Sequence, residues 1–123
     1  MSEDITGIAG VIIWTEPGRH VAMAEFYRDV IGLTPRSDRE GFINFEFGRM
    51  RLTIAHHSAV AGTSGDPLRV MVNLEVPDIQ PVYERLAAGG VVFSRLPEQE
   101  SWGVWIATFN DPDGNTVQLM QVN

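Results

Sequence analysis

The sequence predicts an α+β fold of two βαβββ modules that form a curved, barrel-like mixed sheet with the helices outside. Three observations predict it. A β-branched apolar run followed by an amphipathic helix occurs twice, further short strands follow each copy, and a stretch of small residues separates the copies. A length of 123 residues and a hydrophobic content of 44% suit one domain with one core. We expect a single domain over 1–123, with module one at about 6–57, a linker at 58–67 and module two at about 68–123.

The first module begins with a strand in residues 8–15, IAGVIIWT, which is bounded by turn-forming residues. A helix is expected over 20–31, and Gly32 would end it. Residues 42–48 and 50–56 predict two strands joined by a tight turn at Gly48 and Arg49, with a shorter strand expected within 33–39. The apolar face of the helix consists of Met23, Phe26, Tyr27 and Val30.

The second module repeats this order. A strand at 70–76 precedes a helix that Asp78 is expected to cap and that Gly89 and Gly90 close. The helix has its apolar residues at the spacing of the first helix. They are Ile79, Val82, Tyr83 and Leu86. Three further strands are expected at 91–96, 104–110 and 115–121, the last two joined by the turn at 111–114.

Composition limits the classes of function. Nine basic against 16 acidic residues give a net charge of −7, which repels a phosphate backbone, so we expect no nucleic-acid partner. Apolar runs are too short for a bilayer, and residues 1–6 lack the order of a signal peptide, so we expect a cytoplasmic protein with no membrane partner. The lack of cysteine excludes disulfides, thiol nucleophiles and thiolate metal sites.

Two segments carry a family resemblance. FYRDVIGL at 26–33 and DPDGNTVQLMQ at 111–121 resemble the signature segments of the vicinal oxygen chelate superfamily, and the similarity continues through 72–93 and 101–109. This superfamily includes glyoxalase I, fosfomycin-resistance proteins, extradiol dioxygenases and bleomycin-binding proteins. The resemblance implies the glyoxalase/bleomycin-resistance fold. It implies no single function, because one scaffold hosts many chemistries.

The resemblance also locates the positions of the family's metal ligands. Metal-dependent members hold the ion with His or Gln on the first strand of each module and Glu on the last. The positions similar to these hold Gly10, Thr53, Met71 and Gln118, which implies a member without a metal or other cofactor. His56 and His57 are adjacent on an expected strand and point to opposite faces, so they cannot chelate one ion, although one could face the cleft.

Strand alternation and the positions of the tryptophans indicate which residues would bind a ligand. Ile12 and Trp14 share the parity of Gly10, whereas Asn73 and Glu75 share that of Met71. Trp102 and Trp105 flank Gly103 and would supply aromatic walls, with a core position as the alternative for Trp105. The expected ligand-binding residues are Ile12, Trp14, Thr53, Met71, Asn73, Trp102, Trp105 and Gln118.

We therefore expect a metal-independent small-molecule binding protein that sequesters a hydrophobic, planar or cationic compound, similar to the drug-binding, antibiotic-resistance members of the superfamily. The alternative is a glyoxalase-like or metal-free lyase, isomerase or epimerase, with Glu75 or a histidine such as His56 as acid or base. A third possibility is an interaction module whose cleft its own side chains fill. A homodimer is expected in each case, because members with two modules per chain commonly pair.

Overall fold

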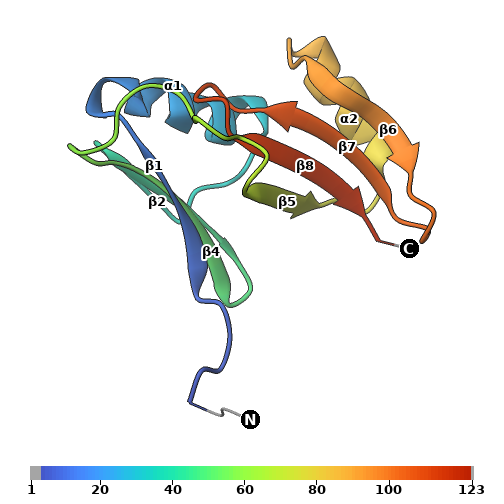
Figure 1. Ribbon diagram of the computed structural model, residues 1–123, viewed down its shortest axis with the longest axis horizontal. Helices are drawn as coiled ribbons and strands as arrows, with labels where there is room; N and C mark the ends of the chain where they lie inside the picture. Colours follow the sequence, from blue (N-terminus) through green and yellow to red (C-terminus); the bar gives the residue numbers. More distant parts are fainter. Residues whose placement is uncertain (1–3, 123) are drawn as a thin grey trace. The chain divides into compact units, whose positions relative to one another are not determined.

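The computed structural model describes residues 4–122 and divides into two compact units, one ending at Gly62 and one beginning at Thr63 (Figure 1). Each unit has the order βαβββ, so the predicted α+β class with two such modules is confirmed. No helix in the described part of the chain is long and apolar enough to span a membrane. The first unit contains β1 (Gly10–Thr15), η1 (Pro17–Arg19), α1 (His20–Glu25), η2 (Phe26–Val30), β2 (Ser37–Arg39), β3 (Phe42–Phe47) and β4 (Met50–His56). The second contains β5 (Met71–Glu75), α2 (Ile79–Ala88), β6 (Phe93–Gln99), β7 (Trp105–Asn110) and β8 (Thr116–Gln121).

The two units share one sheet topology. Their strand orders are β1-β4-β3-β2 and β5-β8-β7-β6. In each unit the first strand pairs in parallel with the last, and the remaining pairs are antiparallel. A parallel pair needs a long crossover, and the intervening helix and strands supply it.

The core of the first unit lies between α1 and one face of its sheet. Met23 and Tyr27 on the helical segment are fully buried, as are Ile43 on β3 and Ile54 on β4. Burying an apolar side chain of this size contributes about 1.5–3 kcal/mol, so these contacts hold the helix on the sheet. His20 at the start of α1 is also buried, with its Nε2 3.3 Å from the Ile54 carbonyl oxygen.

The first helix widens into a π-helical turn at η2. The Ile31 N–H donates to the Phe26 carbonyl at 2.8 Å, five residues earlier. This wider turn changes which side chains face the core, because Tyr27 and Ile31 are buried while Phe26 and Val30 are only half-buried. The regular helical spacing expected from the sequence was therefore only partly right.

An exposed ion-pair cluster connects η2 to β2. Arg28 lies 2.8 Å from Asp29 and 2.9 Å from Asp38 on the edge strand. The hydrogen bonds from Arg28 hold the pKa of Asp29 below its ordinary value. Because these groups are exposed, the pairs add little stability and mainly orient the edge strand.

The second core lies between α2 and the β5–β8 sheet. Leu86 on the helix is buried, as are Val117, Leu119 and Phe109 on the sheet. Phe93 contacts Tyr83 edge-on at 4.8 Å and Phe109 at 5.2 Å between ring centroids, which joins helix and sheet through three aromatic rings.

The N-terminus of α2 differs from the sequence-based expectation. Asp78 occupies the N-cap position, but its side chain makes no capping hydrogen bond. The Ile79 N–H instead donates to Gln121 Oε1 on β8 at 2.7 Å. A partner distant in sequence therefore caps the helix, so the local N-cap pattern pointed to the wrong residue.

We predict that Gln121→Met, which keeps the length of the side chain but removes the acceptor, lowers the free energy of unfolding by about 1–2 kcal/mol, because a half-buried N–H loses its partner. Asp78→Ala should cost less than half as much, since no capping bond is lost. Urea denaturation of both variants tests this order. A larger loss of stability in Asp78→Ala would show that the Asp78 side chain caps the helix.

Candidate functional site

The candidate site of the first unit is the face of its sheet that α1 leaves uncovered. Side chains alternate along each strand, so the register of β1 to β4 determines which residues share this face. We call it the first open face, and it carries Gly10, Ile12, Trp14, Ser37, Phe42, Asn44, Glu46, Arg51, Thr53 and Ala55. Ile12 and Trp14 are 53% and 45% exposed, so two large apolar groups on it remain accessible.

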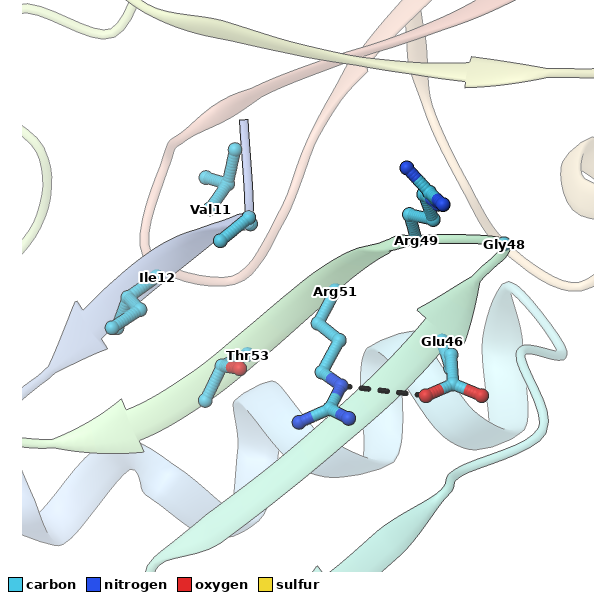
Figure 2. A pocket seen from close by; sticks show the side chains of 9 residues that line it. Val11, Ile12, Glu46, Gly48, Arg49, Arg51 and Thr53 are labelled. Carbon is cyan, nitrogen blue, oxygen red and sulfur yellow. Dashed lines mark hydrogen bonds and ion pairs between the residues drawn. The ribbon is translucent and has the colours of Figure 1, made fainter. Parts of the chain in front are cut away.

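A cleft of about 500 Å³ opens at one end of this face (Figure 2). Figure 2 shows the side chains of Ile12, Thr53 and Arg51 on the same side of β1 and β4. The volume is within the range that holds a small organic ligand. The lining residues are Ala9, Gly10, Val11, Ile12, Glu46, Gly48, Arg49, Arg51 and Thr53.

Two arginines share one carboxylate at this cleft. Glu46 Oε2 lies 3.4 Å from Arg51 Nε and 3.2 Å from Arg36 Nε. Two positive charges and one negative charge leave a local net charge of +1. Arg49 adds a further positive charge at the β3–β4 turn, and Figure 2 shows it directed away from the Arg51 guanidinium. The cleft is therefore locally basic in a protein whose net charge is −7.

Asn44 stands beside the cleft with an unsatisfied buried atom. It pairs in register with Thr53 on β4 and with Ser37 on β2. The residue is 5% exposed, and its Oδ1 has no hydrogen-bond partner within residues 4–122. Buried polar atoms in native proteins nearly always have partners, so this acceptor is an exception within the sheet.

Gly10 allows an unusually close approach of β1 to β4. A Cβ added there would lie 2.4 Å from the Arg51 carbonyl oxygen. Any side chain at this position therefore requires the backbone to move. The first strand has no room for a metal-binding histidine where the family resemblance places one.

The uncovered face of the second unit is built in the same way. We call it the second open face, and it carries Met71, Asn73, Glu75, Ile106, Thr108, Gln118 and Met120. Gln118 lies in a polar row on it. Its Nε2 donates to Asn73 Oδ1 at 3.2 Å, and its Oε1 accepts from Thr108 Oγ1 at 3.3 Å. Both ends of the amide are thus engaged within the sheet.

The edge of the second sheet has the opposite charge balance from the first open face. Arg95 on β6 pairs with Glu98 and with Glu100, the latter at 3.0 Å. One positive and two negative charges leave a local net charge of −1. The hydrogen bonds from Glu98 and Glu100 raise the pKa of Arg95 above its ordinary value.

The residues expected from the sequence fall into separate groups. Ile12, Trp14 and Thr53 share the first open face, whereas Met71, Asn73, Glu75 and Gln118 share the second. Trp105 has the opposite parity on β7, opposite Gln121, and so lies on the side that α2 covers. Trp102 is 67% exposed in the turn before β7.

His56 is exposed at the end of β4 and has the parity of the face opposite Thr53. It has the parity of Leu52 and Ile54, and its ring is 6.3 Å from that of His20. Its Nε2 would be only 2.4 Å from a Cβ added at Gly41, so it packs against the start of β3. The expectation that His56 acts at the cleft is not supported by this placement. Glu75 stays on the second open face and is exposed.

The four positions at which the resemblance places metal ligands do not fit a divalent ion. Thr53 pairs with Ile12, two residues after Gly10, and Gln118 pairs with Asn73, two residues after Met71. The two positions of each module are therefore offset by the same two residues. None of the four offers an imidazole or a carboxylate. Among residues 4–122, no three His, Asp or Glu side chains converge to hold a metal.

Sequence reasoning missed the basic part of the cleft. Arg51 has the parity of Thr53, and the two-residue turn at Gly48 and Arg49 places it opposite Glu46. Those two signals were available in the sequence. The contribution of Arg36 was not, because it depends on the pairing of β2 with β3.

Comparison with known proteins places these features in a family. The model of the Glyoxalase/Bleomycin resistance protein/Dioxygenase superfamily matches residues 17–119. No curated protein sequence matches the chain.

Several solved structures share the fold. A protein from Bacillus anthracis assigned to the glyoxalase family has a TM-score of 0.79 and 20% identity, with 100% of both chains covered. A glyoxalase/bleomycin resistance protein/dioxygenase from Nocardioides has a TM-score of 0.74 and 26% identity, over 95% of this chain and 83% of that one. Lactoylglutathione lyase from Agrobacterium tumefaciens has a TM-score of 0.72 and 18% identity, over 95% and 94%.

We predict that Gly10→Ala lowers the free energy of unfolding by about 1–3 kcal/mol, because the added methyl group forces β1 away from the Arg51 carbonyl. Gly7→Ala is the matched control, since a Cβ there meets nothing within 4 Å. Chemical denaturation of both variants gives the comparison. Equal stability of the two would show that β1 has room for a side chain at position 10.

Proposed function

This chain belongs to the glyoxalase/bleomycin resistance protein/dioxygenase superfamily, and from that premise we propose that it binds a small organic molecule on the first open face without a metal ion. The cleft of about 500 Å³ at that face carries the proposal. It is lined by Gly10 and Thr53, the two first-module positions that the resemblance equates with metal ligands.

The apolar groups of the first open face support a ligand with a hydrophobic or planar body. Ile12 lines the cleft, and Trp14 follows it on the same face of β1. The Trp14 ring has one edge contact, with His57 at 5.2 Å, and keeps much of its surface exposed. Desolvating these surfaces would supply the main part of the affinity.

The residues in place support binding that does not depend on a metal. The cleft contributes a glycine and a hydroxyl where an ion would need imidazole or carboxylate ligands. The close approach of Gly10 to Arg51 restricts that position to glycine. Sequestration of a ligand requires none of the proton-transfer groups of an enzyme.

We expect intrinsic fluorescence to detect this binding in a screen of planar and apolar compounds. Trp14→Phe should remove most of the fluorescence change and weaken the affinity measured by calorimetry about three- to tenfold, the magnitude of one aromatic contact. Trp102→Phe is the matched control, because that ring lies exposed in a turn of the second unit. Loss of the signal in Trp102→Phe alone would place the site elsewhere, and a screen without any saturable ligand would end the proposal.

Metal analysis provides an independent test. After incubation with zinc, nickel, manganese or iron and removal of excess ion, elemental mass spectrometry should find less than about one-tenth of an equivalent of bound metal, because no three His, Asp or Glu side chains converge within residues 4–122. Affinity for the screened ligand should be the same with and without chelator. One tightly bound metal per chain, with ligand affinity lost in chelator, would instead favour a metal-dependent enzyme.

A further inference from the structure

We propose that the ligand of the first open face is a small carboxylate, held through its anionic group by Arg51 and Arg36, with a hydrogen-bond donor directed at Asn44. This inference rests on the proposed function and specifies the class of ligand. The overall charge of −7 favours cationic ligands, but the residues at the cleft have the opposite balance.

The guanidinium groups of Arg36 and Arg51 both contact Glu46 and leave their outer nitrogens available. Glu46 approaches both arginines at Nε, and neither guanidinium makes another hydrogen bond or ion pair within the described part of the chain. The terminal Nη groups of Arg36 and Arg51 therefore remain to donate hydrogen bonds. These groups form the planar fork that binds a carboxylate through two parallel bonds.

Glu46 has a positioning effect on this fork. A single carboxylate shared by two arginines holds them side by side and still leaves a net positive charge. Gly10, which pairs with Arg51 in register, carries no side chain that would cover the guanidinium. An anion can therefore reach Arg51 from the β1 side.

Asn44 supplies an independent observation, a buried hydrogen-bond acceptor. Asn44 pairs in register with Thr53, which lines the cleft, and its Oδ1 has no partner within residues 4–122. Arg51 and Thr53 are two residues apart on β4, so the Gly10–Arg51–Glu46 row and the Ile12–Thr53–Asn44 row of the face are about 7 Å apart along the strands. A rigid molecule with a carboxylate at one end and a hydroxyl at the other has a suitable span, and its apolar body would lie toward Ile12.

Three probes that share a 4-hydroxyphenyl ring and differ in charge test the inference: 4-hydroxybenzoate, 4-hydroxybenzamide and 4-hydroxybenzylamine. Their affinities for the full chain are measured by calorimetry. We expect the carboxylate to bind at least tenfold more tightly than the amide and the amine to bind most weakly. A wider set of aryl and branched alkyl carboxylates with their primary amides extends the comparison. Equal affinity within every acid and amide pair, tighter binding of the amine, or no binding by any carboxylate overturns the inference.

Variants assign the effect to the named residues. Arg51→Gln should remove the preference for the carboxylate over the amide, whereas Arg69→Gln, an exposed arginine of the second unit paired with Asp66, should leave it unchanged. Glu46→Gln keeps an oxygen that accepts from the arginines and removes the competing negative charge, so it should strengthen carboxylate binding severalfold. Asn44→Leu should abolish the preference for 4-hydroxybenzoate over benzoate. An Arg51→Gln variant that folds as the parent does and keeps the acid preference overturns the inference, as does weaker carboxylate binding by Glu46→Gln.

Failure of this inference and failure of the proposed function give different results. If the general screen yields a saturable ligand that is neutral or cationic and insensitive to Arg51→Gln, the chain binds small molecules but the carboxylate assignment is wrong. If neither the general screen nor the carboxylate set yields a ligand, both are wrong.

Discussion

One face of each four-stranded sheet is covered by the helix of its own module, and this constraint determines which residues can meet a ligand. In the first unit, Ile43 and Ile54 are buried on the covered face, whereas Thr53 and Ile12 project from the other. Because side chains alternate along a strand, a shift of one residue exchanges a core position for a site position. The same rule holds in the second unit.

This constraint determines on which face of the sheet each of the expected site residues lies. Ile12 and Trp14 have one parity on β1, which a single continuous strand makes readable from the sequence. His56 has the parity of Leu52 and Ile54, two residues of the apolar core, so its place on the face opposite Thr53 was also readable from the sequence. The histidine was considered for its chemistry, whereas the strand pattern separates it from Ile12 and Thr53.

Most of the fold was predictable because its signals are local. Strands and helices follow from periodicity, and Gly48 and Gly90 mark a turn and a helix end at positive φ, a conformation that glycine adopts without strain. The features that were missed depend on contacts between distant segments. The capping of Ile79 by Gln121 and the meeting of Arg36 with Glu46 both require the sheet register, which no local pattern contains.

The two modules share one topology and differ in the charged side chains that they carry. In the first unit Glu46 of the first open face contacts Arg51 of the same face and Arg36 just before β2, whereas the β6 edge of the second unit has one arginine between two glutamates. Such divergence is tolerated because exposed ion pairs contribute little to stability. The face that the core does not use can therefore differ in charge between the modules without a change of fold.

The positions that the resemblance equates with metal ligands have different structural roles in the two modules. Gly10 permits a backbone approach to Arg51 that a larger residue would prevent, so a histidine there would strain the β1–β4 pair. Gln118 instead uses both ends of its amide to join Asn73 and Thr108 across three strands. Replacing it with glutamate would remove the donor to Asn73 and place a carboxylate against an amide oxygen. Metal-ligating side chains at positions 10 and 118 would therefore disturb contacts between strands in both sheets, so each position is constrained by the sheet that contains it.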